Sequence, residues 1–144
     1  MMSLYLLDTT TLTHLKNGLI RVVANHATHC APTSSDVVGV SSINVEEVIG
    51  GWLAYLQRAR TTYQEVNGSQ NLNDAILALS QFSLYSVTDA SITRYEAFRR
   101  MKRNVGRNDL RLAALALELG AIVVTDNVRD FGRVPGLQHV DWTK

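Results

Sequence analysis

The stretch from Asn108 to Phe131, NDLRLAALALELGAIVVTDNVRDF, decides the fold of this chain of 144 residues. Asn108 is a good N-cap, and Asp109 follows in the first turn, where a carboxylate meets the positive end of the helix dipole. Apolar residues then recur at helical spacing up to Gly120, which can end a helix in a left-handed conformation. Residues 121–125 are apolar and mostly β-branched, as in a strand covered by helices on both faces. The stretch therefore predicts a helix, a short link and a buried parallel strand.

Strand and helix patterns alternate along the rest of the chain. Four further strands are predicted at 4–7, 37–43, 82–87 and 137–142. Helices are predicted between them at 9–16, 19–27, 45–66, 72–79 and 89–106. Strands that alternate with helices predict a three-layer α/β/α fold around a mainly parallel sheet of four or five strands. The length fits a single domain that spans residues 1–144.

Residues 45–79 are predicted to form a helical hairpin with a turn at Asn67-Gly68-Ser69. Asn44 is expected to cap its first helix. Gly50 and Gly51 cost about 1 kcal/mol each relative to alanine in a helix, which suggests that another backbone packs closely there. The apolar residues exceed what one buried face requires, so they predict a partner surface. They are Trp52, Leu53, Tyr55, Leu56, Ile76, Leu77 and Leu79.

The composition narrows the classes of function. The formal charge of +1 comes from 14 basic and 13 acidic residues, so any affinity for nucleic acid must come from a local patch. The single cysteine, Cys30, cannot form an internal disulfide, and no apolar run approaches the ~20 residues that span a bilayer. There is no basic and apolar leader either, so a cytoplasmic location is expected. His26, His29 and Cys30 are too few for a zinc site, and a structural role is favoured for the two histidines.

Carboxylates are placed where several predicted strands end. Asp8 and Asp126 follow strands directly, Glu47 lies early in the helix after another strand, and Asp109 begins a helix next to one. Because ligands of a parallel sheet bind beyond the carboxyl ends of its strands, these four acids are expected to converge. Each of them alone could be a helix cap or a turn residue. Their repeated placement at one edge favours a shared site.

Gathered carboxylates imply a cation. Like charges raise one another's pKa, so such a group is stable near neutral pH only with a compensating positive charge. Mg²⁺, or Mn²⁺, prefers oxygen ligands, and Mg²⁺ keeps several of its waters. A bound ion of this kind can polarise a phosphodiester and lower the pKa of an attacking water. The acids therefore predict metal-assisted hydrolysis.

These motifs resemble those of the PIN-domain ribonucleases, in particular the VapC-type toxins of bacterial toxin–antitoxin systems. The matching segments are Leu-Leu-Asp8-Thr, Glu47-Val-x-x-Gly51, Asn108-Asp109-Leu, Val-Thr125-Asp-Asn127-x-x-Asp130-Phe and Val134-Pro-Gly136. The resemblance implies an endoribonuclease toxin that depends on Mg²⁺ or Mn²⁺, is neutralised by an antitoxin and forms a homodimer. It assigns the metal to Asp8, Glu47, Asp109 and Asp126, with Thr125 close to the metal and Asn127 and Asp130 around the site. Thr10 departs from the family, which usually has asparagine there to orient Asp8.

Two further interpretations stay open. The basic run from Arg94 to Arg107 can contact RNA phosphates through Arg99, Arg100 and Arg103, or it can be a solvated helix face. The chain can also be a catalytically weak or silent domain of the same fold that binds RNA or a partner, for which Thr10 is the main support. An aspartyl-phosphate enzyme is disfavoured, because an Asp-x-Asp phosphatase would need an acid in place of Thr10 and a receiver domain would need a lysine after a late strand. Metal-dependent cleavage of mixed RNA would separate the nuclease from the silent domain.

Overall fold

The computed structural model describes residues 2–101 and 104–144, and its centre is a parallel sheet. The strand order is β3-β2-β1-β4-β5, and each of the four pairings is parallel. The predicted fold class is confirmed, with five strands in the sheet. They are β1 (Leu4–Leu7), β2 (Val37–Ser41), β3 (Ser83–Tyr85), β4 (Ile122–Val124) and β5 (Gln138–Val140).

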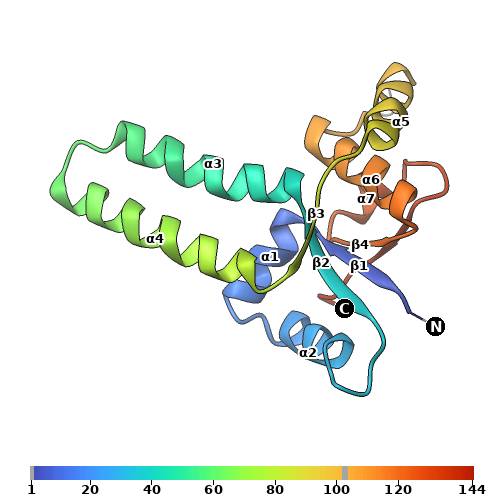
Figure 1. Cartoon of the computed structure of the whole chain (residues 1–144), viewed down its shortest axis with the longest axis horizontal. Coiled ribbons are helices and arrows are strands. Elements are labelled where there is room, and N and C mark those ends of the chain that lie inside the picture. Colours follow the sequence, from blue (N-terminus) through green and yellow to red (C-terminus); the bar gives the residue numbers. More distant parts are fainter. Residues whose placement is uncertain (1, 102–103) are drawn as a thin grey trace.

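Helices cover both faces of the sheet (Figure 1). Successive side chains of a strand point to opposite faces, and β1 shows this clearly. Leu6 packs in a core with the helices on one face, whereas Leu7 packs with Val22 and Trp142 on the other. The first face carries α5 (Asp89–Arg100), α6 (Arg107–Leu119) and α7 (Val128–Phe131), and the second carries α1 (Thr9–Lys16) and α2 (Ile20–His29). The three-layer arrangement is therefore as predicted.

Two long helices, α3 (Ser42–Arg58) and α4 (Thr62–Ser80), form a hairpin that extends away from the sheet (Figure 1). The predicted turn at 67–69 is wrong, because the chain reverses at 59–61 and Gly68 lies inside α4. A Cβ at Gly68 would lie 2.7 Å from the Leu56 side chain and 2.8 Å from that of Tyr55, so this glycine serves the contact between the helices. An added Cβ at Gly50 or Gly51 would meet no heavy atom of another described segment within 4 Å, so the predicted backbone contact there is wrong too.

Several predicted helix ends shift. Ser41 caps α3, and its side chain accepts a hydrogen bond from the backbone N–H of Asn44, so Asn44 lies inside the helix. Glu47 consequently lies in the second turn. Helix α6 begins at Arg107 after Gly106, and Asn108 is a first-turn residue whose Oδ1 accepts from the Arg111 guanidinium at 3.1 Å. Helix α5 ends at Arg100, before the predicted end at 106.

The histidines of α2 make structural contacts. His29 Nδ1 lies 2.8 Å from Asp36 Oδ2, and its ring stacks on Trp142 with 5.1 Å between centroids. The His26 ring packs against Phe82. Within the described ranges, no helix has the length and apolar character needed to cross a membrane.

Candidate active site

Three of the four predicted acids follow neighbouring strands at one edge of the sheet, and the fourth reaches that edge from a helix. Strand β1 lies between β2 and β4, and all three run in the same direction. Asp8 follows β1, Asp126 comes just after β4, and Glu47 lies on α3, which begins where β2 ends. Asp109 reaches this edge from the first turn of α6. The fold therefore brings together acids that are up to 118 positions apart in the chain, from Asp8 to Asp126.

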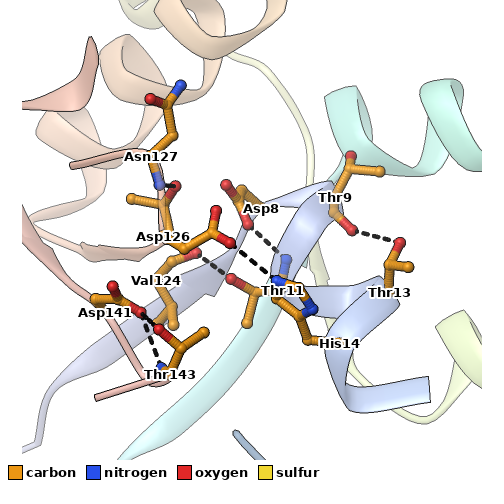
Figure 2. A network of polar contacts seen from close by, with 11 residues as sticks. Asp8, Thr9, Thr11, Thr13, His14, Val124, Asp126, Asn127, Asp141 and Thr143 are labelled. Carbon is orange, nitrogen blue, oxygen red and sulfur yellow. Dashed lines mark hydrogen bonds and ion pairs between the residues drawn. The ribbon is translucent and has the colours of Figure 1, made fainter. Parts of the chain in front are cut away.

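Asp8 is the most buried of these acids, with 5% of its surface exposed. Its Oδ1 accepts a hydrogen bond of 2.8 Å from the backbone N–H of Thr11, so it is the N-cap of α1 (Figure 2). Burial raises the pKa of Asp8, while hydrogen bonds with Thr125 and Thr11 counteract that rise. The carboxylate is thus held in one orientation at the centre of the edge.

Asp109 shows that the acids repel one another. Burial, followed by the charges of Asp8, Glu47 and Asp130, raises the pKa of Asp109 to about 6, although a hydrogen bond with the Asn127 side chain opposes the rise. Such an effect requires the carboxylates to be near neighbours. We call Asp8, Glu47, Asp109 and Asp130 the acidic cluster. Asp130 is thus close enough for its charge to act on Asp109.

Asp126 has a partner that the sequence does not reveal. Its Oδ2 lies 2.9 Å from Nε2 of His14 on α1, and Figure 2 places it beside Asp8. The charge of Asp126 contributes to the raised pKa of Asp8. His14 was not expected here, because no local pattern on α1 indicates a contact with a residue that follows β4.

A chain of hydrogen bonds supports the loop after β4. Thr125 is fully buried, and its Oγ1 accepts a hydrogen bond of 2.9 Å from the backbone N–H of Asn127. The Asn127 amide donates to Asp130 Oδ2 at 3.0 Å, and Arg133 lies 3.4 Å from the other oxygen of Asp130. Thr10, by contrast, is exposed on α1. The structure thus brings Thr125, Asn127 and Asp130 to the site.

The predicted RNA-binding arginines lie at the C-terminal end of α5. Arg99 has 64% of its side chain exposed and pairs with Glu96 at 2.9 Å, and Arg100 is exposed. Arg103 lies outside the described residues. Arg111 on α6 was not singled out from the sequence, and its guanidinium lies 3.6 Å from Glu46. Its position one turn after Asn108, to which it donates a hydrogen bond, could have suggested it.

The donor set suits a hard divalent cation. It consists of carboxylate and hydroxyl oxygens, and the raised pKa of Asp109 records a surplus of negative charge that such a cation would offset. Among the residues that the structure describes, no three His, Cys, Asp or Glu side chains are arranged to hold an ion by themselves. Mg²⁺, which keeps part of its water shell, would be held by such carboxylates partly through its waters.

Comparisons with known proteins identify relatives that match nearly the whole chain. The model of the PIN domain family matches residues 5–137. Ribonuclease VapC1 of Haemophilus influenzae (strain R2866) is 28% identical over 149 aligned positions, which cover 98% of this chain and 99% of that protein. The VapBC-1 structure from nontypeable Haemophilus influenzae has a TM-score of 0.77 at 25% identity and covers 98% of this chain and 99% of that one. The DNA-bound VapBC of Salmonella typhimurium shares the fold, with a TM-score of 0.76, 23% identity and 99% coverage of both chains.

Proposed function

The chain belongs to the PIN domain family, and from this premise we propose that it is a metal-dependent endoribonuclease that acts as the toxin of a toxin–antitoxin pair. The observation that carries the proposal is the gathering of Asp8, Glu47 and Asp109 at one edge of the sheet, where burial and the neighbouring charges raise the pKa of Asp109 to about 6. The names of the relatives, Ribonuclease VapC1 and VapBC-1, support the same class of activity. We place its action in the cytoplasm, where its RNA substrate would be found.

In this proposal Asp8, Glu47 and Asp109 hold Mg²⁺ or Mn²⁺, with Asp126 as a fourth acid. The ion would stabilise negative charge on the phosphodiester and acidify an attacking water. Hydrogen bonds with the Thr11 N–H and with Thr125 keep the Asp8 carboxylate in place, so it does not have to be reoriented in each catalytic cycle. Asn127 and Arg133 hold Asp130, and His14 holds Asp126. The chain's own residues thus orient the acids before RNA arrives.

The toxin role can be tested in cells. Expression of the chain should arrest bacterial growth, and co-expression of its cognate antitoxin should restore growth. A chain with substitutions in the acidic cluster should not arrest growth. Unchanged growth on expression of the wild-type chain at a measurable level would count against the toxin role.

The antitoxin has a suitable docking site near the acids. A cavity of about 600 Å³ lies between α1 and the helical hairpin, and mainly apolar side chains line it. An apolar segment of the antitoxin would remove these side chains from water. The residues of the lining include Leu12, Leu15, Val48, Trp52, Leu79 and Phe82.

We further propose that the exposed apolar residues of the hairpin form a homodimer interface. Leu53 is 46% exposed and Leu77 is 64% exposed. Leu79 was also predicted to belong to this surface, but only 6% of it is exposed, so it is a core residue. Replacing Leu53 and Leu77 together by glutamate should convert a dimer into a monomer in sedimentation velocity, because charged side chains would be buried at the interface. The control is Ile92→Glu on α5, which is 49% exposed. A wild-type chain that sediments as a monomer at high concentration would argue against the interface.

The exposed arginines of α5 are proposed to guide RNA phosphates to the site. Replacing Arg99 and Arg100 by glutamine, with or without Arg103→Gln, should weaken RNA binding and flatten its salt dependence. Each lost phosphate contact should reduce the log–log slope by about 0.7 for single-stranded RNA. Arg94→Gln is the matched control on the same helix, since Arg94 lies in the first half of α5 and pairs with Glu118 of α6 at 2.6 Å, away from the C-terminal end of the helix. If the variants kept the wild-type affinity and slope, these arginines would be a solvated face.

A further inference from the structure

The side-chain amide of Asn44 connects two elements that carry acids of the site. Asn44 is 2% exposed and lies on α3. Its Nδ2 donates a hydrogen bond of 2.9 Å to Thr9 Oγ1 and lies 3.5 Å from Glu47 Oε1. Thr9 is the residue after Asp8 at the start of α1. One buried amide thus bridges the beginning of α1 and the carboxylate of Glu47.

The orientation of this amide is fixed by Ser41. The Ser41 hydroxyl oxygen accepts from the backbone N–H of Asn44 at 3.3 Å, and its hydrogen is donated to Asn44 Oδ1 at 2.6 Å. Because Oδ1 must therefore face Ser41, the NH₂ group faces Thr9 and Glu47. Ser41 is fully buried, so water does not compete for this contact.

The hydrogen bonds continue from Thr9 to Glu47. Since the Thr9 hydroxyl oxygen accepts from Asn44, its hydrogen is directed to Glu47 Oε1 at 2.9 Å. Glu47 is an exposed residue, and a glutamate side chain that is free in water samples several rotamers. The contacts at Oε1 restrict that freedom. The four residues Ser41, Asn44, Thr9 and Glu47 form what we call the amide relay.

We propose that Asn44 is a positioning residue of the active site, which acts through Thr9 to hold Glu47 in the orientation that binds the metal. This inference rests on the proposed function, since it assumes that Glu47 is a metal ligand. Groups that orient metal ligands in this way typically contribute 10-fold to 100-fold to metal affinity. Asn44 itself does not need to touch the ion or the RNA.

The test is calorimetric titration of Mn²⁺ into the wild-type chain, Asn44→Ala, Thr9→Val and the double variant. Each single substitution should raise the Kd for Mn²⁺ by about 10-fold or more. The double variant should bind little more weakly than either single one, because both substitutions break the same relay. Asn25→Ala is the matched control, since the partly buried Asn25 of α2 donates its amide to the Trp142 carbonyl at 3.0 Å, outside the amide relay, and should leave the Kd unchanged.

Melting temperatures in EDTA separate positioning from folding. A merely structural asparagine would lower the melting temperature and leave the Kd for Mn²⁺ of the folded protein as it is. If Asn44→Ala does not fold, Thr9→Val alone carries the test, because it keeps the amide and the size of the side chain. Wild-type affinity in Thr9→Val would overturn the amide relay while leaving the proposed function intact. A wild-type chain that binds no Mn²⁺ would contradict both.

Discussion

Replacing Asp8 by asparagine is expected to abolish measurable Mn²⁺ binding and to slow RNA cleavage by at least about 100-fold, since the metal supplies several kcal/mol of charge stabilisation. Asparagine has the same shape and can still accept the hydrogen bond of 2.8 Å from the Thr11 N–H, so α1 should keep its cap. The loss of Mn²⁺ binding and of RNA cleavage would therefore be due to the missing negative charge. Mn²⁺ titration and a cleavage assay on the same preparation measure it.

Asp141→Asn is the matched control for this change. Asp141 also follows a strand at the same edge, but it accepts hydrogen bonds from the N–H and hydroxyl of Thr143 within its own turn (Figure 2). Its replacement should leave Mn²⁺ affinity and cleavage within about 2-fold of the wild type, because surface changes outside special sites have small effects. Equal cleavage by Asp8→Asn and the wild type would remove Asp8 from the site.

Asp109→Asn is expected to stabilise the metal-free protein and to remove its response to metal. The pKa of Asp109 is raised to about 6, above the value of about 3.9 for an unfolded chain. Between these values the folded state binds more protons than the unfolded state, so this group's contribution to stability falls as pH rises from about 4 to about 6. Asparagine has no such dependence. The gain in the free energy of unfolding of the metal-free variant over the wild type should therefore be small near pH 4 and complete above pH 7.

Thermal unfolding in EDTA at pH 4.5 and pH 7.5 measures this effect. Because Asp109 is only partly buried, we expect a gain of roughly 1 kcal/mol at the higher pH, or about 2–4 °C. Saturating Mg²⁺ should raise the melting temperature of the wild type and leave that of Asp109→Asn unchanged. Asp89→Asn, in the first turn of α5, controls for the loss of a helix-start acid. An equal difference in melting temperature between Asp109→Asn and the wild type at both pH values would contradict the raised pKa of Asp109.

The fold was largely predictable because local patterns report it directly. Short apolar β-branched runs, as at 121–125, alternate with segments of helical spacing, and each indicates how many of its faces are buried. The acids could be predicted for the same reason. In a parallel sheet the position after a strand fixes the edge at which a residue lies, so Asp8 and Asp126 could be placed together from their strands alone.

What could not be predicted depends on contacts between distant segments. Asn67-Gly68 has the composition of a turn, but Gly68 is required by the side chains of Leu56 and Tyr55 that pack against it. Asn44 has the properties of an N-cap. Because Ser41 caps the helix instead, the Asn44 side chain can donate its amide to Thr9. His14 pairs with an acid 112 positions away. None of these contacts leaves a pattern in the neighbouring sequence.

The measurement that tests the central claim most directly is cleavage of a mixed RNA pool by the purified chain with Mg²⁺, with EDTA, and with EDTA followed by excess Mg²⁺. The claim is that Asp8, Glu47 and Asp109, with Asp126 as a fourth acid, hold a divalent ion that RNA hydrolysis requires. We expect cleavage with Mg²⁺, its arrest by EDTA and its recovery when Mg²⁺ is restored, with Asp8→Asn inactive throughout. Equal cleavage in EDTA would contradict the claim. So would intact RNA under all three conditions, which would favour a silent domain that binds RNA or a partner.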